Sequence, residues 1–295
     1  MKVFVTGATG FVGSAVVAEL RDAGHEVLGL ARSTASVEAL SAIGATAHRG
    51  DVQDLRSLRE GAAKADAVIH TAFIHDFTKF AANCEIDRQA IEALGAELAD
   101  SDRPLIVTSG TGLLASGRVS DEQARPAGAN PRIASEQAAD AVAERGVRVS
   151  VVRLPPSVHG DGDHGFVPLL IDFARRKGVS AYVGEGLNRW PAVHRLDAAR
   201  VYRRVLETGA RESRYHAVAE EGIAFREIAE VIGRRLGLPV VGRPIEGAAT
   251  HFEWFAHFAM LDSPASSRKT REWLGWSPTG PDLLADLDRA AYFGG

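Results

Sequence analysis

The chain has 295 residues, enough for one large α/β domain or two small ones. Its 34 basic and 38 acidic side chains leave a net charge of −4, which argues against a dedicated nucleic-acid or polybasic membrane-binding protein. The single cysteine, Cys84, excludes an intramolecular disulfide framework and any metal site with several cysteine ligands.

Short apolar runs alternate with longer helical patterns from the N-terminus to about residue 154. The runs that we predict to be strands are Val3–Val5, Glu26–Ala31, Ala45–Arg49, Ala67–Thr71, Leu105–Thr108 and Arg148–Leu154. Nearly continuous apolar runs suit parallel strands that are buried on both faces. Residues 11–22, between the first two runs, carry the apolar stripe of a helix. The alternation predicts an α/β fold with a Rossmann-type, doubly wound parallel sheet.

Beyond residue 155 the pattern changes. Residues 155–165 are rich in Pro, Gly and Asp and predict a loop, whereas 166–177 and 225–237 predict helices. Residues 181–183 and 215–218 predict short strands. Residues 251–261 predict an aromatic-rich helix that is packed in the core, makes a subunit contact or lines an apolar substrate pocket.

These patterns predict two parts. Residues 1–154 form a dinucleotide-binding core, and residues 192–219 pack back onto it. Residues 155–191 and 220–295 form a smaller C-terminal α/β lobe that completes a substrate cleft. No internal repeat or long linker separates the two parts.

The sequence Gly7-Ala-Thr-Gly10-Phe-Val-Gly13 follows the first predicted strand and opens the first predicted helix. In a dinucleotide-binding turn the first glycine allows the tight turn, the second admits the pyrophosphate, and the third allows close helix–strand packing. The helix start then offers unpaired N–H groups to the phosphates. The turn therefore predicts a dinucleotide site, the alternative being a structural turn without a ligand.

Further motifs follow in chain order. They are Gly50-Asp51, His70-Thr-Ala72, Thr108-Ser-Gly-Thr111, Arg153-Leu-Pro-Pro156 and Val193-His-Arg-Leu-Asp197-Ala-Ala199. With the glycine-rich turn they resemble an extended or atypical short-chain dehydrogenase/reductase, the group called NAD-dependent epimerase/dehydratase. The resemblance covers nearly the whole chain. It implies an adenine contact at Asp51, a catalytic hydroxyl within residues 108–111, and a nicotinamide contact at residues 153–156.

The second predicted strand ends without the carboxylate that usually accepts from the ribose 2′-hydroxyl of NAD. It is followed instead by Arg32, Ser33 and Thr34, which suit a 2′-phosphate. We therefore predict NADP(H) rather than NAD(H), unless Arg32 is only a solvated surface arginine. The predicted cofactor-binding residues are Gly7, Thr9, Gly10, Phe11, Val12, Gly13, Arg32, Ser33, Asp51, Val52, Thr71, Ala72, Thr108, Leu154 and Pro155.

The family's catalytic Tyr-x-x-x-Lys pair is absent, because none of the five lysines follows a tyrosine by four residues. Arg132 and Glu136 occupy the two positions. An arginine stays protonated and cannot act as the general acid. The two side chains are spaced to form an i, i+4 ion pair, and Arg132 is alternatively placed to bind an anionic substrate or a cofactor phosphate.

Other residues must then supply the proton. Ser109 and Thr111 are candidates to hydrogen-bond a carbonyl oxygen, and His159 or His164 to donate a proton near neutral pH. A metal site in residues 159–164 is disfavoured, since Gly and Asp in short loops usually reflect turn chemistry. We expect His194 to be structural, and we treat the i, i+4 spacing of His75 and Lys79 as coincidental.

The sequence thus favours an NADP(H)-dependent oxidoreductase that transfers hydride to a partly apolar carbonyl- or imine-like substrate through a non-standard proton donor. The alternatives are a catalytically silent NADP(H) sensor and an epimerase or dehydratase. The family resemblance implies a homodimer. The chain start lacks a signal-peptide pattern, and no apolar run reaches the roughly 18 residues of a membrane span. We therefore expect a cytoplasmic protein.

Overall fold

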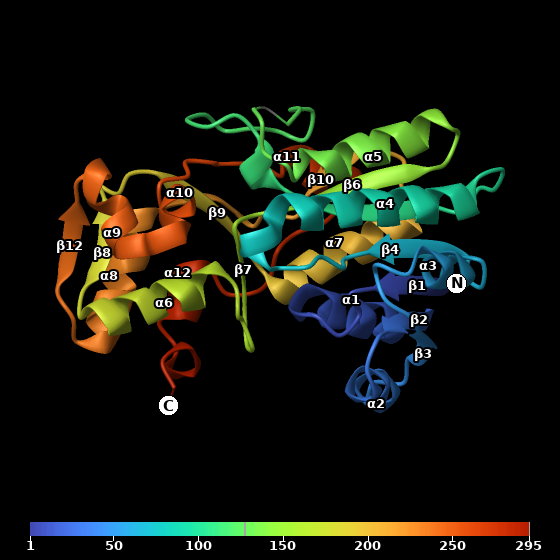
Figure 1. The fold of residues 1–295 in the computed structure, drawn as a ribbon, viewed down its shortest axis with the longest axis horizontal. Helices are drawn as coiled ribbons and strands as arrows, with labels where there is room; N and C mark the ends of the chain where they lie inside the picture. The colour runs from blue at the N-terminus through green and yellow to red at the C-terminus, as the bar shows by residue number, and fades with distance from the viewer. Residues whose placement is uncertain (127, 295) are drawn as a thin grey trace.

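The computed structural model describes residues 1–126 and 128–294. A seven-stranded parallel sheet in the order β10-β6-β5-β4-β1-β2-β3 forms the larger part of the molecule (Figure 1). Its strands are β1 Lys2–Thr6, β2 Glu26–Ala31, β3 Thr46–Arg49, β4 Ala67–His70, β5 Leu105–Gly110, β6 Val149–Leu154 and β10 Arg214–His216. The strand order reverses between β1 and β4, which confirms the predicted doubly wound fold.

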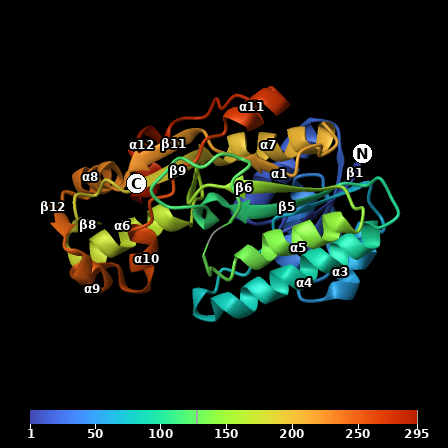
Figure 2. The ribbon, with the colours of Figure 1, turned by 90° about the horizontal axis from the view of Figure 1, so that it is seen from above.

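Helices cover both faces of this sheet (Figure 2). They are α1 Phe11–Asp22, α2 Thr34–Ala42, α3 Leu55–Ala62, α4 Phe80–Leu98, α5 Ile133–Glu144, α7 Arg195–Glu207 and α11 Arg268–Leu274. Alternate residues of β1 point to opposite faces, so Val3 and Val5 join the apolar cluster with α1 and α7. Phe4, between them, packs in the cluster with α3, α4 and α5.

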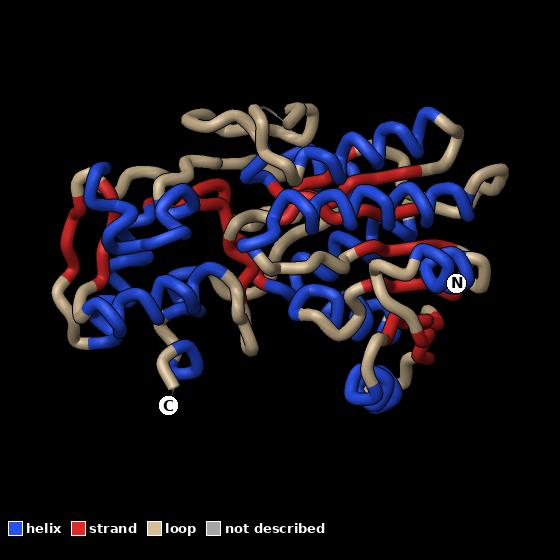
Figure 3. The backbone as a smooth tube through the Cα atoms, viewed as in Figure 1, coloured by secondary structure: helices blue, strands red, loops and turns tan. Residues whose placement is uncertain are grey.

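The smaller part is built on two short sheets, seen in red on the left of Figure 3. One has the order β11-β9-β7, and the other pairs β12 with β8. Its strands are β7 Ser157–His159, β8 Ser180–Val183, β9 Arg189–His194, β11 Glu220–Ala224 and β12 Val240–Arg243. Its helices are α6 Phe166–Lys177, α8 Phe225–Leu236, α9 Ala248–Phe252, α10 Ala256–Ala259 and α12 Leu283–Leu287. Short 3₁₀ turns are η1 Phe77–Lys79, η2 Thr111–Leu113, η3 Ile245–Gly247, η4 Glu253–Phe255 and η5 Ala290–Tyr292.

Two local predictions are wrong. The predicted loop 155–165 contains a strand, β7, which pairs in parallel with β9, Ser157 lying opposite Ala192. The predicted single helix over residues 251–261 is broken into α9, η4 and α10. Glu253, with a φ of 55°, lies in the left-handed region and ends α9.

The chain passes repeatedly between the two parts. After entering the smaller part at β7, it returns to pack α7 against α1 and to add β10 to the edge of the large sheet. After α8, α9 and α10 it returns again, and α11 contacts α7 and β10. Within the two described stretches, no helix combines the length and apolarity needed to cross a membrane.

Candidate cofactor and active site

The glycine-rich turn lies against the end of β4. Gly7 has a φ of +66°, and a Cβ there would lie 2.7 Å from the Ala72 nitrogen. A Cβ on Gly13 would lie 2.0 Å from the Gly7 oxygen. Residue 13 must therefore be a glycine for the start of α1 to lie this close to the turn after β1. Gly10 is exposed, and the only atom near its absent Cβ is the Gly7 oxygen at 3.2 Å. The cradle therefore fits a pyrophosphate at the start of α1.

A buried polar chain connects this turn to the next strands. The Thr6 hydroxyl lies 2.7 Å from His70 Nδ1, and His70 Nε2 lies 3.0 Å from Asp87 Oδ1. Thr6 Oγ1 also accepts from the Ala72 amide at 3.3 Å, and Thr71 donates to the Thr6 carbonyl at 2.7 Å. These bonds fix Thr71 and Ala72 beside the turn, where the sequence predicts a cofactor contact.

Arg132 extends this chain. Its guanidinium donates to Asp87 Oδ2 at 2.5 Å and to the Thr108 carbonyl at 3.2 Å, and it contacts the Ser135 hydroxyl. It also stacks over the Phe73 ring at 4.0 Å. Burial opposes ionisation of Asp87, but the charge of Arg132 and the bonds from His70 and Ser135 outweigh it, so the pKa of Asp87 lies well below its usual range.

Glu136 does not pair with Arg132, so the i, i+4 ion-pair interpretation is wrong. Arg153 donates to both Glu136 oxygens at 2.8 Å, and Arg214 donates to Oε2 at 2.9 Å. Ser109 donates to Oε1 at 2.8 Å. Burial alone would raise the pKa of Glu136, but these donors lower it from 4.5 to about 2. At the position of the family's lysine, a buried carboxylate thus joins three strands.

The predicted catalytic roles of Ser109, Thr111 and His159 stay predictions. Ser109 is buried, and its hydroxyl is engaged with Glu136. Thr111, in η2, is also fully buried, and its hydroxyl has no hydrogen-bond partner among the described residues. His159 is fully buried in the smaller part, where Nδ1 lies 2.8 Å from Asp286. Burial lowers the pKa of His159 despite this partner.

Two further histidines considered in the sequence, His164 and His194, lie in different surroundings from His159. His164 is exposed and packs edge-on to Phe11 of the glycine-rich turn, with ring centroids 5.7 Å apart. His194 lies beside His159, with ring centroids 5.5 Å apart. Asp197 is buried and accepts from the backbone of Thr279 and Gly280, so the late His-x-x-Asp motif ties α7 to the C-terminal segment.

The predicted adenosine end lies at the tips of β2 and β3. Arg32 is exposed and has no ion-pair partner in the described residues. The Ser33 hydroxyl accepts from the Ser36 amide and caps α2, so its lone-pair capacity is partly used. Arg49, which the sequence reasoning missed, ends β3 and donates to the Thr34 hydroxyl at 3.3 Å. Two exposed arginines therefore lie at the ends of neighbouring strands, Arg32 just after β2 and Arg49 as the last residue of β3.

The remaining predicted cofactor residues lie at the same strand ends. Asp51 follows β3, and its carboxylate accepts from the Gln53 amide at 2.9 Å. Val52 packs against the apolar core, and Thr9 is exposed at the turn.

The Thr108 hydroxyl donates to the His70 carbonyl and contacts Tyr202 of α7 at 2.8 Å. Val12 packs in the core beside α7. Leu154 pairs with Gly110 at the ends of β6 and β5, and Pro155 follows it.

Three residues of the segment after β4, Phe73, His75 and Phe77, were not predicted to take part. His75 is exposed, and its ring lies 5.2 Å from that of Phe73, on which Arg132 stacks. Desolvation by the surrounding protein and the charges of Arg132 and His164 lower the pKa of His75. The Phe77 ring stacks on Trp254 of the smaller part at 4.9 Å. The only sequence signal was the run of aromatic residues after the fourth strand.

The aromatic residues of 251–261 lie in two different environments. Phe252 and Phe255 are buried in the apolar core of the smaller part. Trp254 is half exposed, and Phe258 lies 5.8 Å from Phe77. The stacked rings of η1, η4 and α10 therefore form an apolar wall where the two parts meet beyond β4.

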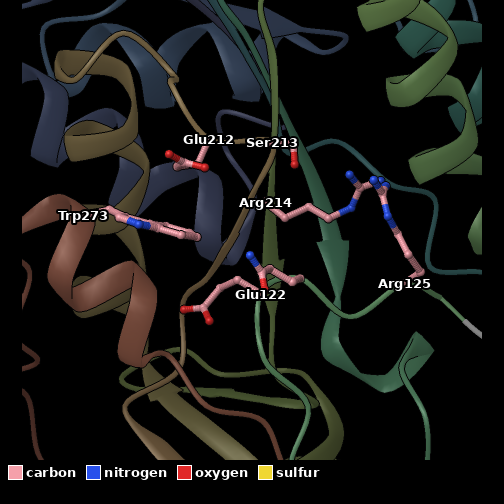
Figure 4. A pocket seen from close by; sticks show the side chains of 7 residues that line it. Glu122, Arg125, Glu212, Ser213, Arg214 and Trp273 are labelled. Carbon is pink, nitrogen blue, oxygen red and sulfur yellow. The ribbon is translucent and has the colours of Figure 1, made fainter.

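Two cavities lie away from this wall. One has a volume of about 300 Å³ beside the β10 edge of the sheet, between the β5–α5 connection and α11 (Figure 4). A second, of about 130 Å³, is lined by the 160–163 loop and Tyr292. Among residues 1–126 and 128–294, no three His, Cys, Asp or Glu side chains gather in an arrangement able to hold a metal ion.

Comparison with known proteins places the fold. The sequence pattern of the NAD dependent epimerase/dehydratase family matches residues 3–218. An uncharacterized protein of Schizosaccharomyces pombe is 49% identical, over 99% of this chain and 100% of its own length. The chain belongs to the NAD-dependent epimerase/dehydratase family. The resemblance inferred from the motifs is thereby confirmed.

Two other similar proteins have names that indicate different reactions. A ketoreductase of Stigmatella aurantiaca acting on a 4-hydroxy-2-methyl-3-oxo-4-farnesyl-3,4-dihydroquinoline-1-oxide is 29% identical over 60% of this chain and 56% of its own. The dTDP-glucose 4,6-dehydratase DesIV of Streptomyces venezuelae, solved with NAD, superposes with a TM-score of 0.80 at 21% identity, covering 99% and 97% of the two chains. The proteins similar to this chain thus include a ketoreductase by sequence and a dehydratase by fold.

Proposed function

We propose that this family member is an NADP(H)-dependent reductase of a partly apolar carbonyl- or imine-like compound. The observation that carries the proposal is the pair of exposed guanidinium groups, Arg32 and Arg49, at the tips of β2 and β3. No carboxylate follows β2 to accept from a ribose 2′-hydroxyl. A 2′-phosphate there would gain two cationic donors and the exposed Thr34 side chain.

The glycine cradle holds the middle of the cofactor. Gly7, Gly10 and Gly13 leave room for a pyrophosphate at the start of α1, and Thr71 and Ala72 are fixed beside it. When bound, the nicotinamide supplies the hydride. The chain's own residues orient the ring at the ends of β4, β5 and β6, where Leu154 and Pro155 lie.

The substrate then lies between these strand ends and the aromatic wall of Phe77, Trp254 and Phe258. Contact with that wall is the reason for proposing a partly apolar substrate. Arg132 stands at the family's tyrosine position and orients an oxygen or nitrogen of the substrate without giving up its proton. Of the histidines, His75 is the one that is exposed and shares the Phe73 ring with Arg132, so it is the proposed proton donor.

Cofactor titration tests the proposal. NADPH and NADH are added to the purified protein, to Arg32→Ala and to Arg49→Ala, and binding is measured by calorimetry. Loss of a charge-assisted contact worth about 1.5–3 kcal/mol should weaken NADPH binding at least about tenfold and leave NADH binding unchanged. Arg145→Ala, an exposed arginine at the end of α5, is the matched control. Equal affinity for both cofactors, or equal weakening of both, refutes the NADP(H) preference.

Turnover is measured separately. A panel of aldehydes, ketones and cyclic imines is screened for NADPH consumption, and active substrates are tested with His75→Gln. Loss of kcat without loss of NADPH binding supports His75 as the donor, whereas unchanged kcat excludes it. Tight NADPH binding with no turnover on the panel favours a sensor that has kept the cofactor site. The missing Tyr-x-x-x-Lys pair and the burial of Glu136 favour that second function.

A further inference from the structure

The cavity beside β10 has its own chemistry. Its lining residues are Glu122, Gln123, Arg125, Glu212, Ser213, Arg214 and Trp273. They come from the connection between β5 and α5, the start of β10, and α11. Figure 4 shows Glu212, Trp273 and Glu122 along one side and the side chains of Arg214 and Arg125 extending to the other. None of the residues predicted to bind cofactor or substrate lines this cavity.

Glu122 carries an unsatisfied oxygen. Its side chain is almost fully buried at 2% exposure, and Oε1 accepts from both the amide and the hydroxyl of Thr270 at 2.7 Å. Oε2 is buried and has no hydrogen-bond partner in the described residues. A buried carboxylate oxygen without a donor is costly, so a donor brought by a ligand would be bound favourably.

The two arginines of the cavity do not provide that donor. Arg214 is held by Glu136 at 2.9 Å and by both oxygens of Asp140 at 2.8 Å. Arg125 donates to Asp140 at 3.2 Å. The charges of both guanidinium groups are therefore compensated on the side away from Glu122.

The charges of the two glutamates on the other side of the cavity, Glu122 and Glu212, are not compensated in this way. Neither Glu122 nor Glu212 forms an ion pair within residues 1–126 and 128–294. Glu212 is exposed, but its backbone is fixed, because its amide donates to the Tyr215 hydroxyl at 3.1 Å. Trp273, partly exposed, stands on the same side in Figure 4 and offers a ring to a hydrocarbon chain or a cation.

We propose that this cavity is a binding site for a small aliphatic cation, whose ammonium groups reach Glu122 and Glu212 while its chain lies on Trp273. A volume of about 300 Å³ lies at the small end of ligand sites, so a short diamine fits better than a nucleotide or a peptide. The site is separate from the proposed cofactor cleft. It adjoins that region through Arg214, which meets Glu136 and so reaches Ser109, and through Arg153, which donates to the Glu122 carbonyl at 3.5 Å.

The test uses 1,4-diaminobutane as the probe, with calorimetry on the full chain at pH 7. The diamine should bind saturably, n-butylammonium should bind more weakly because it has one charge, and 1,4-butanediol should not bind. Glu122→Gln keeps the acceptor for Thr270 but removes the charge, and it should weaken diamine binding at least tenfold. Glu144→Gln, an exposed glutamate at the end of α5, is the matched control and should bind as the unaltered protein does.

Further variants keep the proposal refutable if Glu122→Gln unfolds. Glu212→Gln should reduce the affinity for the diamine to that for n-butylammonium, and Trp273→Leu should weaken both. Equal binding of the diol, no saturable binding of the diamine, or unchanged affinity in Glu212→Gln and Trp273→Leu overturns the proposal. Because the readout is cation binding, it stands or falls independently of NADPH binding and turnover.

Discussion

The buried carboxylate of Glu136 gives the sharpest stability prediction. Glu136→Gln keeps the shape of the side chain but removes the charge between Arg153 and Arg214, and its amide faces an arginine donor. The pKa of Glu136 is lowered from 4.5 to about 2, which at 1.36 kcal/mol per unit corresponds to about 3 kcal/mol of folding free energy. Because the folded pKa lies below the unfolded value, this contribution is present above pH 4.5 and is lost as the pH falls towards 2.

The assay is urea unfolding at pH 7, followed by circular dichroism and repeated at lower pH. Glu136→Gln should lose about 3 kcal/mol at pH 7, within the range for breaking a buried ion pair. Asp140→Asn is the control, because Asp140 is 47% exposed and meets the same Arg214. It should lose less than about 1 kcal/mol. Equal losses for the two variants, or no loss for Glu136→Gln, would refute the assignment of the buried network as a main source of stability.

Three further outcomes are expected. Gly13→Ala places a Cβ 2.0 Å from the Gly7 oxygen, so NADPH binding measured by calorimetry should be lost; retained affinity would contradict the cradle. Arg132→Ala leaves buried Asp87 without its guanidinium and should cost about 3 kcal/mol in urea unfolding, with Arg132→Lys recovering part of that loss. Burial raises the pKa of Asp163 from 3.8 to about 6, so the folded state binds the extra proton and stability falls as the pH rises through 6. In urea unfolding, Asp163→Asn should therefore be more stable than the native chain above pH 6 and no more stable below pH 4. An equal difference in unfolding free energy between the two proteins at both pH values would contradict the raised pKa of Asp163.

The central strands could be predicted because each of them is a nearly continuous apolar run in the sequence. β2 covers the predicted 26–31, and β5 and β6 begin within one residue of their predicted starts, since strands buried on both faces are continuous apolar runs. The first helix, with its apolar stripe, also has the predicted bounds of 11–22. These elements need no knowledge of their distant neighbours.

Partners across the fold could not be predicted. Nothing in the sequence indicated that Glu136 would meet Arg214, 78 residues away, rather than Arg132, four residues away at the N-cap of the same helix. Arg132 instead meets Asp87, 45 residues back along the chain. Helical spacing shows which side chains are able to meet, but tertiary packing decides which partner is nearer. The same holds for β7, whose pairing with β9 gives a strand to a Pro- and Gly-rich segment.

The repeated passage of the chain between the two parts has a consequence for any attempt to divide the protein. Cutting after Leu154 would remove α7, which covers α1, and β10, which shields the β6 edge of the large sheet. The fragment would present the apolar side of α1 and an open strand edge to other chains, the features that drive aggregation. Neither residues 1–154 nor the remainder of the chain should therefore be obtainable as a stable independent piece.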